Sequence, residues 1–202
     1  MTYIDLTMPL TPDTPVYPGD PEVEVTEITT VADDGYMDHT LKMGTHNGTH
    51  IDGPAHMVAG GKMLSDFPLD TFIGPGKLVD ARNGLTPAGI DAAGVAKGDI
   101  VLIYTGASDL YTDPDYYYQT PVVSDEAAMH LIKLGVKIVG LDMGSIDEDP
   151  FIVHKALLRK DILIIENLVN LASLLNAEFT VYALPLNLHV EGAPARVIAE
   201  AR

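Results

Sequence analysis

Short apolar runs, separated by turn-forming residues and by helical stretches, dominate the chain beyond residue 75. Runs of this length, bounded by Gly, Asp or Pro and rich in β-branched side chains, are typical of buried β-strands. The pattern predicts strands within residues 76–82, 98–106, 136–143, 161–168 and 179–186.

Two stretches between these runs carry helix signals. In residues 124–135 (SDEAAMHLIKLG), Ser124 can cap the helix, acidic residues favour its first turn, and Gly135 can end it. The second stretch is residues 149–160 (DPFIVHKALLRK), which starts near Pro150 and ends in basic residues. We therefore expect two helices, each lying between two of the predicted strands.

The amino-terminal part of the chain has a different composition and residue pattern. Five prolines between Met8 and Glu24 exclude a helix and favour an ordered loop. Residues 23–31 alternate in polarity and predict a strand, and residues 35–46 form a second candidate strand. Strands followed by alternating strands and helices predict a mixed α/β fold. The length of 202 residues predicts a single domain over residues 1–202.

The charge balance narrows the range of partners. Against 29 acidic residues there are only 12 basic ones, which gives a net charge of −17. This field repels phosphate backbones and anionic lipid surfaces, so we expect no nucleic-acid and no membrane partner. No stretch approaches the roughly 18 apolar residues of a membrane span, and the amino terminus has no export signal. The sequence therefore predicts a cytoplasmic protein that acts on a small molecule.

The segment GTHNGTHIDGPAH, residues 44–56, holds three of the seven histidines of the chain. His46, His50, Asp52 and His56 share parity, so an extended strand would point all four to one face. Protonated imidazoles packed this closely would repel one another, whereas a divalent cation uses neutral imidazoles and an anionic oxygen as ligands. The chain has no cysteine. The segment therefore predicts a nitrogen- and oxygen-ligated site for zinc, manganese or iron(II).

A second pair of polar residues lies further along the chain. Glu166 stands at the end of a predicted buried strand and needs a partner there, and His154 lies in the second predicted helix. Alone, each is more often structural. Together they could hold a second cation, with Asp52 as the bridge. The other histidines, and an ion pair for Arg196, are expected to be structural, and the tyrosine-rich residues 109–121 to form either a surface loop or a lid.

The stretch HNGTHIDGPAH resembles the HxGTHxDxPxH signature of the putative cyclase family, which includes bacterial kynurenine formamidases and isatin hydrolases. The resemblance continues in order and spacing along nearly the whole chain. It is carried by PVYPGDP, VLIYTG, GLDMGSIDEDPFIVHKALLRKDILIIENL and YALPLNLHVEGAPAR.

The resemblance implies a set of site residues. In the formamidases of this family a dinuclear zinc centre is held in this way, and isatin hydrolases use one manganese. One or two ions, zinc first and manganese second, are therefore implied. The metal ligands implied for this chain are His46, His50, Asp52, His154 and Glu166. His56 would be the proton-transfer residue.

The resemblance also implies a fold, an assembly and a substrate contact. The implied fold is an α/β swivelling β/β/α domain, that is, a mixed sheet with a few helices, and the implied assembly is a homodimer or homotetramer. Tyr17 stands where the formamidases carry a tryptophan that packs on the aromatic substrate. Tyrosine can stack as well, with less area and a polar tip.

These observations predict a metal-dependent hydrolase of a small amide, similar to an arylformamidase. Water activated by the cation would attack the carbonyl carbon, and His56 would move the proton to the leaving nitrogen. Hydrolysis of a cyclic amide of the isatin type, or of a lactone, is an alternative. An alternative of another class is a metal-binding protein without catalysis, which would have no need of a proton shuttle.

Overall fold

The computed structural model describes residues 1–113, 115–118 and 123–202. The strands are β1 Thr2–Asp5, β2 Glu24–Thr29, β3 Asp38–Lys42, β4 His50–Asp52, β5 Ile73–Asp80, β6 Ile100–Tyr104, β7 Ile138–Leu141, β8 Leu163–Glu166, β9 Phe179–Pro185 and β10 Gly192–Ala201. The α-helices are α1 Val31–Asp34, α2 Pro87–Ala92, α3 Asp125–Leu134 and α4 Ile152–Leu158. The short 3₁₀ helices are η1 Pro54–His56, η2 Leu64–Asp66, η3 Leu69–Phe72, η4 Ala107–Leu110, η5 Tyr116–Tyr118 and η6 Leu171–Leu174.

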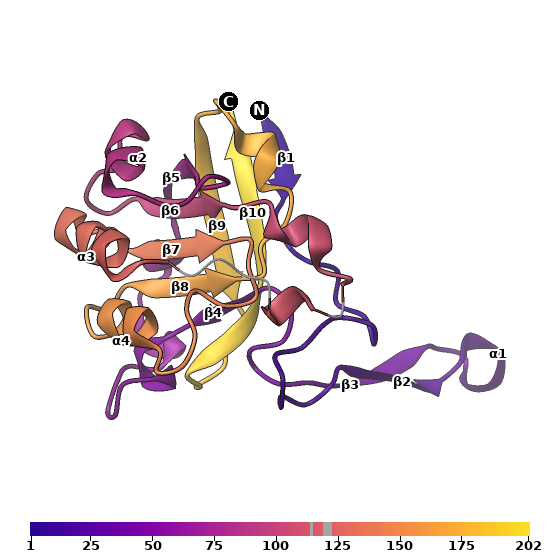
Figure 1. Ribbon diagram of the computed structural model, residues 1–202. Helices are drawn as coiled ribbons and strands as arrows, with labels where there is room; N and C mark the ends of the chain where they lie inside the picture. Colours follow the sequence, from indigo (N-terminus) through magenta and orange to yellow (C-terminus); the bar gives the residue numbers. More distant parts are fainter. Residues whose placement is uncertain (114, 119–122) are drawn as a thin grey trace.

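Seven strands close into a mixed barrel. The strand order is β10-β4-β8-β7-β6-β5-β9. The barrel closes because the last strand, β9, pairs over the whole length of β9 with the first strand, β10. Strands β5 to β8 run parallel and the other pairings are antiparallel; β1 pairs with the carboxy-terminal part of β10. The expectation of a swivelling β/β/α domain is therefore wrong: the sheet closes on itself, and helices α2, α3 and α4 lie along one side of it (Figure 1).

Two apolar layers follow from the alternation of side chains along the strands. On β6, Ile100 and Leu102 point into the barrel, where they meet the closing strands β9 and β10. Val101 and Ile103 point outward and pack under α2, α3 and α4. At the closure, Gly76 of β5 leaves the room that the ring of Phe179 fills, because a Cβ at this position would overlap it.

The predicted buried strands and both predicted helices are confirmed, with shifted ends. Ser124 caps α3 by accepting a hydrogen bond from the N–H of Ala127, and Gly135 ends the helix in the left-handed conformation. The second predicted helix is shorter than its pattern, because α4 begins only at Ile152. Strand β10, the longest of the barrel, was not predicted from the sequence.

The two strands predicted near the amino terminus pair with each other in a separate two-stranded sheet. They form a two-stranded ribbon, capped by the single turn of α1, that projects away from the barrel (Figure 1). The proline-rich segment before β2 lies without regular structure apart from turns, as predicted. Within the described residues, no helix has the length and the apolar character needed to cross a membrane.

Candidate metal centre

The pairing of β4 with β8 builds the centre of the site. His50 stands directly opposite Glu166, and its Nε2 lies 3.6 Å from Glu166 Oε2. Asp52, two residues along β4, points to the same face, and its Oδ1 lies 3.3 Å from His50 Nε2. Ile51 and Ile165, which alternate with these residues, point into the barrel. The site therefore lies on the outer face of the barrel, beside α4.

The expectation that one extended strand carries all four polar groups of the histidine segment is wrong. Only His50 and Asp52 lie on β4. Gly48 has a φ of +64°, which breaks the extended conformation and leaves His46 in a turn, while His56 lies in η1. The side chains still meet, because His46 Nδ1 lies 2.7 Å from Asp52 Oδ1. The ring centroids of His46 and His56 are 4.1 Å apart.

Helix α4 contributes the fourth imidazole of the site, that of His154. His154 is buried and its Nε2 lies 3.1 Å from Glu166 Oε1 and 3.8 Å from Asp52 Oδ2. The rest of the inner face of α4, with Val153 and Leu157, packs on the apolar layer outside β8. The structure therefore brings together all five predicted ligands and His56, from two strands, a turn, an α-helix and a 3₁₀ helix.

Each of the three central imidazoles uses its second nitrogen to hold its orientation. His50 Nδ1 donates to the carbonyl oxygen of Gly48 at 2.9 Å. His154 Nδ1 donates to a very close carboxylate oxygen of Asp147. On His46, Nε2 lies 3.3 Å from Glu191 Oε1. Such acceptors fix the tautomer of metal-ligating histidines and leave the other nitrogen free for an ion.

Asp147 and Glu191 were missed in the sequence. Asp147 belongs to the acidic run DED, which by itself is typical of a solvated surface, yet it is buried and also accepts a hydrogen bond from the N–H of Val153 at 2.6 Å. Its place shortly before the start of the predicted helix that carries His154 could have pointed to it. Glu191 directly precedes Gly192, where a Cβ would collide with the ring of His46; no local pattern marks the role of Glu191.

The donor set fits a divalent cation. Two groups of three side chains each bring one possible ligand atom per residue within 4.8 Å of the others in the group. The groups are His46 with Asp52 and His56, and His50 with Asp52 and Glu166. Asp52 belongs to both groups, and its Oδ2 is buried without a hydrogen-bond partner. An orphaned carboxylate oxygen in a buried position is costly unless it has a ligand. Imidazole nitrogens with carboxylate oxygens suit zinc, manganese or iron(II).

The charges in the cluster stabilise one another strongly. Burial by itself lowers the pKa of His50, but Asp52 and Glu166 outweigh it and raise the pKa to about 9. Burial opposes protonation of His154 too, and its hydrogen bonds to Asp147 and Glu166 raise its pKa to about 10. For Asp52, the burial that would raise the pKa is outweighed by the facing histidines, which lower it. A cluster that holds positive charge this firmly can exchange its protons for a divalent cation.

His56 differs from the other histidines of the cluster. Burial lowers its pKa below the usual value, and neighbouring positive imidazoles act in the same direction. In the described part of the chain, no hydrogen bond fixes either of its ring nitrogens. A neutral imidazole that is free to accept a proton is the expected state of a proton-transfer residue near neutral pH.

A cavity of about 270 Å³ opens beside these side chains. Its walls are formed by Tyr17, Asp20, His46, His50, His56, Met57, Tyr117, Gly144, Ser145, Phe151, His154 and Glu166. Tyr17 and Tyr117 meet edge to face, with ring centroids 5.6 Å apart. Three aromatic rings therefore stand around the entrance to a polar floor. Of the tyrosine-rich segment, Tyr117 belongs to the cavity wall, whereas residues 114 and 119–121 lie outside the described residues.

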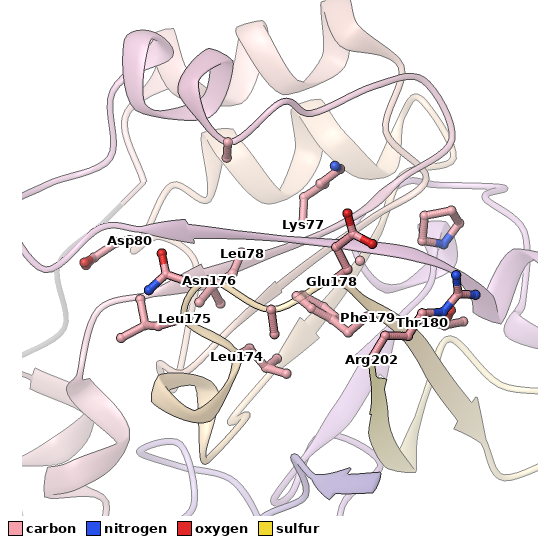
Figure 2. A pocket seen from close by; sticks show the side chains of 14 residues that line it. Lys77, Leu78, Asp80, Leu174, Leu175, Asn176, Glu178, Phe179, Thr180 and Arg202 are labelled. Carbon is pink, nitrogen blue, oxygen red and sulfur yellow. The ribbon is translucent and has the colours of Figure 1, made fainter. Parts of the chain in front are cut away.

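A larger hollow of about 630 Å³ lies elsewhere, between β5 and residues 174–180. Figure 2 shows Lys77, Glu178 and Arg202 among the side chains that line it, together with the apolar Leu174 and Phe179. No histidine lines it, and the charges at its edge have both signs. It offers no convergent set of chemical groups, so the smaller cavity beside the histidines is the candidate functional site.

The remaining polar residues singled out in the sequence are structural, as expected. His130 Nε2 lies 2.7 Å from Asp91 Oδ1, and His189 pairs with the Ser65 hydroxyl. Arg196 forms an ion pair with Asp5 rather than facing the cavity.

An Asp147→Asn variant is expected to bind metal about 10–100-fold more weakly, because His154 loses the charged acceptor that fixes its ring. Isothermal titration with Zn²⁺ measures this change. Asp99→Asn is the matched control, since Asp99 is equally buried and accepts a backbone N–H in a turn before β6. Equal affinities for the two variants would contradict an orienting role for Asp147.

The fold and the site together define a closed mixed barrel with a buried histidine and carboxylate centre on its outer face. The family model described as "Putative cyclase" matches residues 4–148. A kynurenine formamidase of Geobacillus thermodenitrificans is 33% identical over 205 residues, which cover 96% of this chain and 95% of that protein. The chain therefore belongs to the putative cyclase family.

Solved structures agree with this assignment. Isatin hydrolase A from Labrenzia aggregata superimposes with a TM-score of 0.89 at 25% identity, over 98% of this chain and 93% of that one. A protein described as a "predicted metal-dependent hydrolase", from Bacillus stearothermophilus, gives a TM-score of 0.82 at 30% identity, over 98% and 97% of the two chains. The fold is therefore that of isatin hydrolase and not a swivelling β/β/α domain.

Proposed function

We propose that this protein is a metal-dependent hydrolase of a small amide. The observation that carries the proposal is the convergence of nitrogens from His46, His50 and His154 on the carboxylates of Asp52 and Glu166, at the floor of a cavity. The relatives named kynurenine formamidase and the solved metal-dependent hydrolase support the reaction class.

We assign the five ligands to two groups that share the carboxylate of Asp52. His46, His50 and Asp52 would hold a first cation, and His154 with Glu166 would hold a second, with Asp52 between them. A bound divalent cation supplies a water molecule of pKa about 7 and an electrophile for the substrate carbonyl. Zinc suits this donor set best, and manganese suits it too.

The proton balance of amide hydrolysis indicates the role of His56. Hydrolysis adds water to the carbonyl carbon and breaks the C–N bond, so the leaving nitrogen must gain a proton. His56 faces the cavity next to His46, is neutral near pH 7, and is not committed to another partner among the described residues. It accepts a proton from the attacking water and delivers it to the nitrogen.

The walls of the cavity favour a flat substrate. Tyr17, Tyr117 and Phe151 present aromatic rings above the polar floor, and such rings bind planar ligands by stacking or by edge contacts. An aryl formamide fits this shape. A cyclic aromatic amide fits it as well, which is the second candidate, because the isatin hydrolase fold is so similar.

The decisive experiment combines metal analysis with substrates. The purified protein is stripped with a chelator, reloaded with Zn²⁺ or Mn²⁺, quantified by mass spectrometry, and assayed with formanilides, isatin, small lactams and lactones. We expect turnover of an aromatic amide that depends on reloading. Stoichiometric metal without turnover of any of these compounds would favour a metal-binding protein without catalysis.

A Tyr17→Ala variant is expected to raise KM for a formanilide about 5–10-fold with little change in kcat, because an aromatic contact to the substrate is lost. Steady-state kinetics at saturating metal measure both constants. Tyr17→Phe keeps the ring and should stay within about twofold of the parent protein. An unchanged KM in Tyr17→Ala would show that this ring does not contact the substrate.

A further inference from the structure

A buried asparagine, Asn167, lies directly behind the candidate metal centre. It follows Glu166 at the end of β8, and its backbone is left-handed, with a φ of +58°, a conformation that asparagine adopts more readily than most residues with a Cβ. Its N–H donates to the carbonyl oxygen of Met143 at 2.8 Å, and its carbonyl oxygen accepts from the Thr49 hydroxyl at 2.6 Å. The backbone at Asn167 is therefore fixed on both sides, which limits where the side chain can point.

The carboxamide of Asn167 connects two parts of the site. Its Nδ2 donates to the carbonyl oxygen of Gly48 at 3.2 Å, and the same oxygen accepts from Nδ1 of His50 at 2.9 Å. On the other side, its Oδ1 accepts from the hydroxyl of the buried Tyr116 at 3.0 Å. Three consecutive hydrogen bonds therefore lead from the hydroxyl of Tyr116 to the ring of His50.

Tyr116 is also packed against the aromatic wall of the cavity. Its ring meets that of Tyr117 edge to face, with centroids 5.1 Å apart. The ring of Tyr117 lines the cavity, and its hydroxyl donates to the carbonyl oxygen of Pro15 at 3.3 Å. A Cβ at Gly144 would overlap the ring of Tyr117 and would crowd that of Tyr116, so both rings lie tightly on the segment after β7. A displacement of Tyr116 would therefore displace the wall as well.

We propose that Tyr116 is a positioning residue that couples the aromatic wall to the metal centre through Asn167. The inference rests on the proposed function, because it concerns how the groups for metal and for substrate act together. A carbonyl oxygen that Asn167 holds in place stays aimed at Nδ1 of His50, which leaves Nε2 directed at the ion. Buried hydrogen bonds in a chain polarise one another, so each strengthens the next. Coupling of this kind is reciprocal, and an ordered His50 in turn favours an ordered Tyr116.

The same hydrogen bonds also contribute to the stability of the fold, because buried polar groups must be paired. A purely structural role would lower the free energy of unfolding without changing the zinc affinity of the folded protein. A positioning role changes that affinity, although Tyr116 is not among the proposed ligands. Zinc affinity therefore separates the two roles, and it does not depend on knowing the substrate.

The test is a double-mutant cycle of Tyr116→Phe and Asn167→Gly, measured by isothermal titration of the chelator-stripped protein with Zn²⁺. Tyr116→Phe removes the hydroxyl and keeps the ring. Asn167→Gly removes the carboxamide, and glycine adopts the left-handed backbone of this position without strain. Tyr182→Phe is the matched control, since it removes a tyrosine hydroxyl that donates to Glu200 at 2.9 Å on β9, outside the cavity.

We expect each single variant to bind Zn²⁺ about 3–10-fold more weakly than the parent, because an orienting partner of a ligand is lost one step beyond its direct acceptor. The Tyr182→Phe control should bind like the parent. The double variant should bind no more weakly than the weaker single variant, since both substitutions break the same chain of hydrogen bonds.

Parent-like zinc affinity in Tyr116→Phe, or losses that simply add in the double variant, would overturn this inference and leave the proposed function intact. A parent protein that binds no Zn²⁺ would overturn the proposed function, and this inference with it. If Asn167→Gly does not fold, the comparison of Tyr116→Phe with Tyr182→Phe decides by itself.

Discussion

A His50→Ala variant is expected to lose its metal. His50 is buried, and its Nε2 faces both Asp52 and Glu166, at 3.3 Å and 3.6 Å. Removal of this imidazole takes one nitrogen ligand from the centre. It also leaves the carboxylates of Asp52 and Glu166 without the group that lies between them, so their mutual repulsion increases. Because loss of an outer partner already costs about 10–100-fold in metal affinity, loss of a direct ligand should cost more than about 100-fold.

Metal content after reloading, measured by mass spectrometry and by titration with Zn²⁺, checks this result. His130→Ala is the control, because this histidine pairs with Asp91 away from the cavity. Both variants should give the same far-ultraviolet circular dichroism. A His50→Ala protein that keeps full metal stoichiometry at parent affinity would remove His50 from the ligand set, and the cation centre would have to be built on the other residues.

A His56→Ala variant is expected to keep its metal and to lose turnover by about 10²–10⁴-fold, the usual contribution of a positioned proton-transfer group. The physical reason is the separation of tasks in the cluster. His46, His50 and His154 each have a fixed acceptor behind the ring, as ligands require. His56 has no such acceptor among the described residues, which leaves it able to give and take a proton.

The geometry makes this a strict test. His56 lies close enough to His46 and Asp52 to share an ion with them, so a ligand role competes directly with the shuttle role. Metal analysis separates the two: an empty His56→Ala protein would identify a ligand, whereas a loaded but inactive one identifies the shuttle. Added imidazole should restore part of the turnover in the loaded variant, since the cavity left by the ring can admit it.

Local signals predicted much of the secondary structure. The runs of Val, Ile and Leu in β6, β7 and β8 are buried on both faces, and such strands are recognisable because they are apolar throughout. Helix α3 was predicted to within a residue because both of its capping residues are specific. The sequence signals of these elements lie within short stretches of the chain, so they can be recognised without the tertiary structure.

Closure of the barrel was not predictable in this way. Strand β10 reads GAPARVIAEA, and its inward positions are mostly small, such as Ala195 and Ala199. Alanine is depleted in strands, so these positions carry little strand signal. Ala195 and Ala199 are nevertheless buried in the apolar cluster inside the barrel. The same segment therefore gives no strand signal in the sequence, although it holds the barrel together.

The sequence by itself determined which atoms are available for chemistry. Without cysteine, any ion must be held by imidazole and carboxylate groups, and the spacing in GTHNGTHIDGPAH already gathers most of them. Tertiary structure decided how they meet. Gly48 turns the chain so that His46 folds back on Asp52. Helix α4 carries His154, and Asp147 orients its ring toward Glu166. Contacts between residues distant in the chain depend on packing and burial, which spacing along a sequence does not encode.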